Sequence, residues 1–232
     1  MIIHRVEQGS LEWLMLRLGI PTASRFSDIL TPSKLAPSKS QAKYMAELVA
    51  EWALSRPLDD DSSVYMERGR EMEETAIAKY ELLRDVEVDR VGFITTDDGL
   101  MGCSPDGLVE DDGDLEVKCP SAKVHMEYLL NGGPLEDYTL QQQGRLGITG
   151  RRWTDFFSYH PTLPPVLVRF ARDERIISAV MHEVPRFASR VADAKQLILS
   201  MGYTPPPVIM PDTIIESGRP KIRLGETIGL LD

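Results

Sequence analysis

Short β-branched segments punctuated by glycine, aspartate and proline are the feature of this sequence that most restricts its fold. They occupy residues 86–96, 100–109 and 114–120, and two apolar and aromatic segments follow at 153–160 and 165–171. Such segments are typical of β-strands joined by tight turns. Because segments with apolar residues at helical spacing stand on both sides of them, the order of elements predicts an α/β fold.

The expected helices show the helical spacing of apolar residues. They are residues 11–19, a second helix capped by Thr22 or Ser24, and residues 41–55, 66–83, 122–131, 135–148 and 173–201. We expect the last helix to be interrupted, or to begin again, near Pro185, because proline removes a helical hydrogen bond. Residues 31–40 are rich in proline, serine and lysine and predict a loop.

The length and composition predict one domain. A chain of 232 residues with 42% hydrophobic and 27% charged residues can bury one substantial core. We expect a single domain over residues 1–232, in which the Pro-rich segment 203–232 forms a C-terminal arm or tail. The sequence has no long apolar run and no pattern of a signal peptide at its start. A cytoplasmic location is therefore expected, with no membrane contact.

Two kinds of cofactor chemistry find no support in the sequence. Cys103 and Cys119 are the only cysteines, too few for a disulfide framework or for a metal site built from four cysteines. We expect both to be reduced and buried. The sequence also lacks the glycine-rich G-x-x-x-x-G-K-[ST] loop that holds ATP phosphates, so no ATP-driven motor is expected.

The net charge of −10 weighs against a nucleic-acid partner, because affinity for phosphates comes largely from lysine and arginine. Binding, however, needs only one local basic stripe. The candidates for such a stripe are Arg17, Arg25, Lys34, Lys39, Lys43, Arg145, Arg151 and Arg152. From charge alone, a scattering of solvated basic residues is the alternative, and it stays open at this point.

Asp106, Glu116 and Lys118 predict a metal site. If residues 114–119 form a strand, Glu116 and Lys118 project from the same face, and Asp106 approaches that face across a hairpin. Two carboxylates on one face repel each other unless a cation lies between them, and carboxylate oxygens suit Mg²⁺. Lys118 would then orient a water or stabilise charge on a phosphate. This spacing also arises by chance in about one chain of this size in two, so a solvated hairpin edge is the alternative.

Two further residues could complete this cluster. Glu73 lies beside a predicted helical stripe of Met72, Ala76, Tyr80 and Leu83, which would pack the helix on the sheet. Its carboxylate could then be a third acidic ligand, although a surface glutamate is the plain alternative. Gln141 lies on a helix expected to cover the sheet, where a partly buried amide needs a hydrogen-bonding partner such as a water or a phosphate.

Five blocks of the sequence, in order, resemble the phage lambda exonuclease family, the YqaJ-like viral recombinase branch of the PD-(D/E)xK nucleases. The blocks are VEQGSLEWLMLRLGIPTASR, RGREMEETA, SPDG followed by LEVKCP, YTLQQQ, and VRFARDERIISAVMHEVPRF. Together they span about residues 5–202. The resemblance implies a restriction-endonuclease-like core, with a central mixed β-sheet flanked by helices. It also implies a DNA exonuclease that degrades the 5′-ended strand and releases mononucleotides.

The same resemblance assigns a role to each matching residue. Asp106 and Glu116 match the metal-binding carboxylates, with the carbonyl of Val117 as an extra ligand, and Lys118 matches the catalytic lysine. Glu73 matches an acidic residue near a second metal, and Gln141 matches a glutamine that holds the attacking water. The residues that match the pocket for a 5′-phosphate are Arg17, Ser24 and Ser104.

The resemblance further implies two Mg²⁺ ions per site, with Mn²⁺ as a substitute, and a homotrimeric ring around duplex DNA. It implies a phage or prophage recombination setting in a bacterial host, with a single-strand annealing protein as partner. The loop at 31–40 and the tail after Tyr203 depart from the family pattern. Two other functions are weighed: an endonuclease on the same core, and a DNA-end-binding protein with a decayed site.

Overall fold

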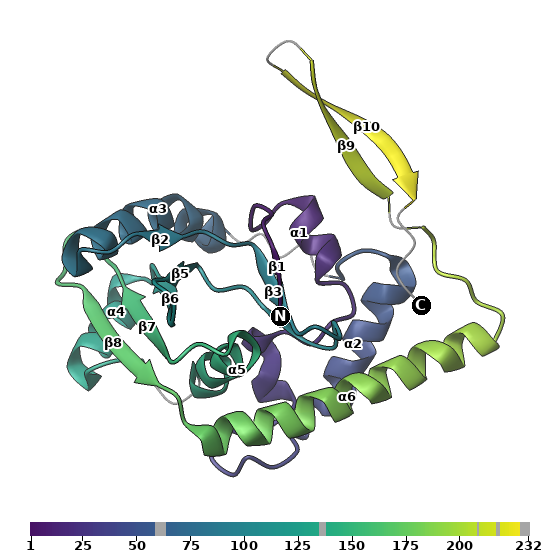
Figure 1. The fold of residues 1–232 in the computed structure, drawn as a ribbon, viewed down its shortest axis with the longest axis horizontal. Coiled ribbons are helices and arrows are strands. Elements are labelled where there is room, and N and C mark those ends of the chain that lie inside the picture. Colours follow the sequence, from purple (N-terminus) through teal and green to yellow (C-terminus); the bar gives the residue numbers. More distant parts are fainter. Residues whose placement is uncertain (59–63, 135–137, 208, 217–218, 228–232) are drawn as a thin grey trace.

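A five-stranded mixed sheet flanked by helices forms the centre of the computed structural model (Figure 1). The structure describes residues 1–58, 64–134, 138–207, 209–216 and 219–227, with side chains for 1–58, 72–134 and 138–207. Along the sheet the strands are β2 (Val88–Asp89), β5 (Gly107–Val109), β6 (Gly113–Lys118), β7 (Trp153–Ser158) and β8 (Val166–Ala171). Only the pair β6–β7 is parallel among these neighbours. The predicted α/β class with a mixed sheet is confirmed.

The helices lie around this sheet. They are α1 (Leu11–Leu16), the 3₁₀ helix η1 (Ala23–Asp28), α2 (Gln41–Leu54), α3 (Val64–Arg84), α4 (Ala122–Asn131), α5 (Thr139–Thr149) and α6 (Glu174–Ser200). Of these, α3, α4 and α5 contact its strands. Helix α3 lies along one face and α5 lies against the other, with α6 running beneath α5 (Figure 1). None of the helices in the described ranges is long and apolar enough to cross a membrane.

The predicted meander between residues 86 and 120 divides between two sheets. Strands β3 (Phe93–Thr95) and β4 (Gly102–Cys103) lie outside the main sheet, in a second sheet where β3 pairs with both β4 and the N-terminal β1 (Ile2–His4). In the segment predicted as a C-terminal arm, β9 (Ile209–Glu216) and β10 (Arg219–Thr227) form an antiparallel hairpin that extends from the body (Figure 1). Residues 208, 217–218 and 228–232 of that segment lie outside the described residues.

The expectation of a break at Pro185 is wrong, because α6 runs without interruption from Glu174 to Ser200. Proline inside a helix costs about 3 kcal/mol. On the same helix, Val180, Val184, Phe187 and Val191 are buried in the core, and each buried apolar side chain contributes about 1.5–3 kcal/mol. The packing of this face therefore outweighs the lost hydrogen bond.

Three smaller expectations also need correction. The predicted second helix after Pro21 is the 3₁₀ helix η1, with Thr22 at its N-cap. On α3, Leu83 is 49% exposed, whereas Ala76, Ile77 and Tyr80 are buried. Residues 135–137 of the predicted helix 135–148 lie outside the described residues, and α5 begins at Thr139.

The packing of α3 and α5 determines where the site can form. The face of α3 around Ala76 and Tyr80 packs on Leu115 and Val117 of β6. On the other face, α5 approaches η1 at Gly144, where an added Cβ would lie 2.5 Å from the Phe26 ring. A glycine at this position is therefore needed for the close approach that brings η1 next to α5.

Candidate active site

The predicted metal site lies where β6 extends beyond β5. The last pair between these strands is Gly107 with Leu115, while β6 continues to Lys118 beside β7. Asp106 stands just before β5; its N–H donates to the Leu115 carbonyl at 3.0 Å, and its Oδ2 accepts from the Val117 N–H at 2.6 Å. Since the N–H and C=O groups of one strand residue point to the same side of the strand, the Val117 carbonyl faces the side where Asp106 lies.

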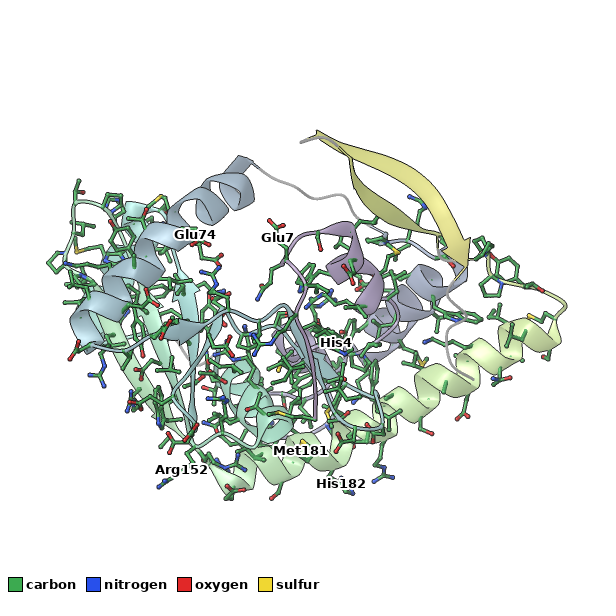
Figure 2. All side chains as sticks on the ribbon, turned by 45° about the horizontal axis from the view of Figure 1, so that its top comes forward. His4, Glu7, Glu74, Arg152, Met181 and His182 are labelled. Carbon is green, nitrogen blue, oxygen red and sulfur yellow. The ribbon has the colours of Figure 1, made fainter. Side chains whose placement is uncertain are left out.

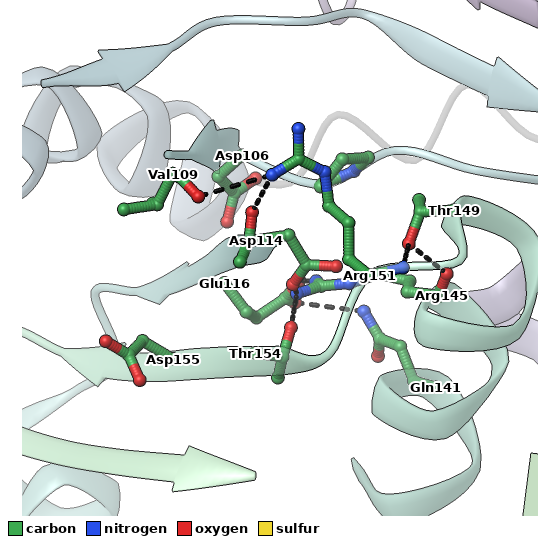
Figure 3. Close-up of polar contacts among 12 residues, drawn as sticks. Asp106, Val109, Asp114, Glu116, Gln141, Arg145, Thr149, Arg151, Thr154 and Asp155 are labelled. Atoms are coloured by element: carbon green, nitrogen blue, oxygen red, sulfur yellow. Dashed lines mark hydrogen bonds and ion pairs between the residues drawn. The ribbon is translucent and has the colours of Figure 1, made fainter. Parts of the chain in front are cut away.

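Glu116 has its two carboxylate oxygens in different surroundings (Figure 3). The side chain is 2% exposed. Oε1 accepts from the Lys118 Nζ at 2.5 Å and from the Gln141 amide at 2.9 Å, whereas Oε2 is bound by the Arg145 guanidinium. The predicted shared face of Glu116 and Lys118 is confirmed, as is the placement of Gln141 on a helix that covers the sheet.

Arg145 and Asp114 are the residues of this cluster that the sequence patterns missed. Arg145 is 1% exposed and also donates to Asp114 Oδ1 at 2.5 Å and to the Thr154 hydroxyl at 2.8 Å. Its predicted place in a basic surface stripe is therefore wrong. Burial raises the pKa of Asp114, and the guanidinium of Arg145 opposes that shift. A signal was present: residues 114, 116 and 118 put three charges on one face of a buried strand.

Glu73 reaches the site from α3, the helix on the opposite face of the sheet. Its side chain is 27% exposed, and its Oε1 accepts from Arg90 at 3.1 Å. Burial raises the pKa of Glu73, and the negative charge of Asp106 raises it further, while Arg90 and Lys118 act in the opposite direction. Glu73 and Asp106 are therefore close enough to interact electrostatically, as a shared acidic site requires.

Two of the residues predicted to bind a 5′-phosphate, Arg17 and Ser104, are in contact. Nη1 of Arg17 donates to the Ser104 hydroxyl at 3.0 Å, and the guanidinium lies 4.1 Å from the centre of the Trp13 ring. The Trp13 indole N–H donates to the same hydroxyl at 3.0 Å. Burial lowers the pKa of Arg17, but an arginine stays charged in proteins. Ser24 is exposed at the start of η1, with its hydroxyl 3.4 Å from that of Thr22.

One cavity of about 870 Å³ joins the two halves of the site. Its lining includes Arg17, Ser24, Glu73, Ser104, Asp106, Glu116, Lys118 and Gln141. Figure 2 shows Glu74 of α3 and Glu7, which precedes α1, on opposite sides of this cavity. The structure thus gathers every predicted side chain around one space, while the roles of those residues stay predictions.

The donor atoms fit a hard divalent cation. Asp106, Glu116, Glu73 and the Val117 carbonyl offer the oxygen ligands that Mg²⁺ prefers. Among the described residues, no three carboxylate, histidine or cysteine side chains converge closely enough to hold a metal as they stand. Glu116 and Glu73 are instead paired with Lys118 and Arg90. An ion would replace these contacts at oxygens that already face the cavity.

Three other basic residues proposed for a DNA-binding stripe bind elsewhere in the protein or point away from the cavity. Arg25 is tied to Asp28 and Glu47. Arg151 donates to three backbone carbonyls of the β5–β6 hairpin. Arg152 is 77% exposed and points away from the cavity (Figure 2). Among the candidates, only Arg17 and the buried Arg145 line the cavity.

Comparison with known proteins places the chain among viral recombinases and exonucleases. The model of the YqaJ-like viral recombinase domain matches residues 12–152. The alkaline exonuclease LHK-Exo from Laribacter hongkongensis is 34% identical, with a TM-score of 0.75 over 83% of this chain and 98% of that chain. Its complex with dAMP gives the same values.

A phage-related exonuclease from Haemophilus somnus 129PT is 16% identical, with a TM-score of 0.57 over 78% of this chain and 96% of that chain, and supports the fold alone. A comparison with curated proteins gave no match. The family model covers more than half of the chain, and the similarity to LHK-Exo extends over most of it. The chain therefore belongs to the YqaJ-like viral recombinase family, within the group of lambda-type exonucleases that its motifs resemble.

Proposed function

We propose that this protein is a divalent-metal-dependent DNA exonuclease that digests the 5′-ended strand of duplex DNA and leaves a 3′ single strand. The observation that carries the proposal is the single cavity that joins an acidic cluster with a lysine to an arginine and serine pocket. The first half has the groups needed to hydrolyse a phosphodiester, and the second can hold a terminal phosphate. Family membership supports the same activity.

Asp106, Glu116 and the Val117 carbonyl would hold one Mg²⁺ ion, and Glu73 would contribute to a second. Bound there, two such ions would lower the pKa of an attacking water and stabilise the leaving 3′-oxygen. Mn²⁺ prefers similar oxygen ligands and is expected to substitute.

Lys118 and Gln141 would act directly on the reacting groups. Lys118 is 36% exposed and lines the cavity, so its ammonium can reach a phosphate while it remains close to Glu116. It would stabilise negative charge on the phosphate under attack. The Gln141 amide donates to Glu116 through its nitrogen, so its oxygen is available to accept a hydrogen bond from the attacking water.

The 5′-to-3′ polarity rests on the phosphate pocket. Arg17 presents a planar fork suited to the two oxygens of a phosphate, and the hydroxyls of Ser24 and Ser104 can donate at short range. A 5′-phosphate held there would place the first phosphodiester bond near Lys118, which favours release of mononucleotides. LHK-Exo was solved with dAMP, a deoxynucleoside monophosphate of the kind that such hydrolysis would release.

A homotrimeric ring around DNA and a single-strand annealing partner complete the proposal, both on the strength of the family resemblance. An acidic exterior around a channel lined by the active sites would reconcile a net charge of −10 with a DNA substrate. Sedimentation velocity is expected to give a trimer, and a stable monomer at working concentration contradicts the ring.

The activity is tested by digestion of linear duplexes labelled at either end of one strand, with and without a 5′-phosphate. In Mg²⁺ we expect mononucleotides from the 5′ end and no product in the presence of a chelator. A covalently closed circular duplex of the same sequence is the control. Cutting of the circle would establish an endonuclease instead, and binding to ends without hydrolysis would establish a DNA-end-binding protein.

A further inference from the structure

Arg145 is a buried cation that lies behind the proposed metal site. It stands one helical turn after Gln141 on α5, and both side chains point to Glu116 (Figure 3). An isolated charge in the interior is costly unless it is paired and hydrogen-bonded. Arg145 is paired twice, with Glu116 and with Asp114, so a shared charge network joins the helix to β6.

In this network the two carboxylate oxygens of Glu116 have different partners. Oε2 faces the guanidinium of Arg145, which is 1% exposed, whereas Oε1 faces Gln141 and Lys118, and Lys118 is 36% exposed. Without a restraint on Oε2, the carboxylate could rotate and present either oxygen, or both, to the cavity. The contact with Arg145 leaves Oε1 as the oxygen available to a cation.

The position of Arg145 is itself restrained from the far side. Nη2 donates to Asp114 Oδ1 at 2.5 Å and to the Thr154 hydroxyl at 2.8 Å. Asp114 and Thr154 are fully buried, on the neighbouring strands β6 and β7. The planar fork of arginine can contact Glu116 and Asp114 at once, which the single ammonium of a lysine cannot do in the same geometry.

We propose that Arg145 is a positioning residue for metal binding, which holds the Glu116 carboxylate so that Oε1 alone is a metal ligand. The inference rests on the metal site of the proposed function. Groups that orient metal ligands typically change metal affinity by about 10–100-fold when they are replaced. Arg145 contacts neither the proposed ion nor DNA; it acts through Glu116.

The test is Mn²⁺ binding to the DNA-free protein, followed by the electron paramagnetic resonance signal of free Mn²⁺. Arg145→Lys keeps the charge and loses the fork, and we expect its Mn²⁺ affinity to fall by about 10–100-fold. Arg151→Lys is the matched control, since Arg151 donates to carbonyls of the same sheet and is outside the cavity lining. Its Mn²⁺ affinity should stay unchanged.

Circular dichroism and thermal unfolding establish that each variant is folded. If Arg145→Lys does not fold, Asp114→Asn replaces it, because it removes the charged anchor of the guanidinium and keeps both Arg145 and Glu116. Weaker Mn²⁺ binding by the folded variant supports the role of Arg145. Binding as tight as that of the unmodified protein, or a loss equal to that of Arg151→Lys, overturns it.

Asp106→Asn separates this inference from the function on which it rests. If Asp106→Asn weakens Mn²⁺ binding and Arg145→Lys does not, the positioning role of Arg145 is refuted and the metal site stands. Absence of Mn²⁺ binding in the unmodified protein, or binding that Asp106→Asn does not weaken, refutes the metal site and the role of Arg145 with it.

Discussion

The phosphate pocket can be tested by replacing Arg17 with lysine, which keeps the positive charge and removes the planar fork. Among the residues whose side chains the structure describes, the guanidinium of Arg17 donates only to the neutral hydroxyl of Ser104, and its flat face rests on Trp13. The remaining N–H groups are therefore free to form two parallel bonds to a 5′-phosphate.

The expected loss follows from the number of these bonds. A lysine at this position keeps one charge-assisted hydrogen bond of the two, and such a bond contributes about 1.5–3 kcal/mol. That corresponds to about 10–150-fold in kcat/KM. The loss should be confined to 5′-phosphorylated duplexes, because a duplex with a 5′-hydroxyl never forms the second bond.

The assay compares kcat/KM for 5′-phosphate and 5′-hydroxyl ends in both proteins, which forms a double-mutant cycle between Arg17 and the phosphate. Arg25→Lys is the control, since Arg25 is bound to Asp28 and Glu47 and does not line the cavity. An equal loss on both substrates, or the same selective loss in the control, would show that Arg17 does not hold the terminal phosphate.

Three further predictions concern the acidic cluster and the helix beside it. Lys118→Ala should retain DNA binding, measured by gel shift in Ca²⁺, and lose about 10²–10³-fold in kcat; near-normal turnover would refute its role. Burial and Asp106 raise the pKa of Glu73, and a raised pKa in the folded protein lowers stability as pH rises through it. Without metal, the Glu73→Gln variant should therefore unfold at a higher temperature than the unmodified protein at pH about 7. Near pH about 4 free glutamate is largely protonated, so the two proteins should unfold at the same temperature. A lower unfolding temperature at neutral pH contradicts this. The Tyr80 hydroxyl donates to buried Asp155 at 2.8 Å, so Tyr80→Phe should cost about 1.5–3 kcal/mol in urea unfolding, and no loss of stability would show that α3 does not depend on this bond.

Local periodicity predicted those parts of the site that depend on one element. The alternation of side chains along a strand predicted Glu116 and Lys118 on one face, and in the structure Lys118 Nζ lies 2.5 Å from Glu116 Oε1. The helical stripe placed α3 against the sheet, although Leu83 was assigned to the wrong side. The prediction of a helix break at Pro185 failed because it considered only the hydrogen bond that proline removes. It did not take into account the core contacts made by the buried face of α6.

Partnerships between distant elements could not be predicted in the same way. Arg145 lies on a helix with other polar residues, and nothing in its immediate neighbours distinguishes a buried arginine from a solvated one. Only the position of α5 over β6 brings it to Asp114 and Glu116. The buried carboxylates of Asp114 and Glu116 on β6 require a cation nearby, but the spacing of these residues could not identify Arg145 as that cation.

The buried network also changes what the net charge means for DNA binding. Arg145 is neutralised within the protein by Asp114 and Glu116, so it adds nothing to the attraction for phosphates. The carboxylates of Asp106 and Glu73 repel a DNA phosphate that enters the same cavity. Under the proposed function, a cation held by these carboxylates removes that repulsion, and a bound phosphate in turn adds to the attraction for the cation. Because such coupling is reciprocal, DNA must raise the affinity for metal by the same factor by which metal raises the affinity for DNA.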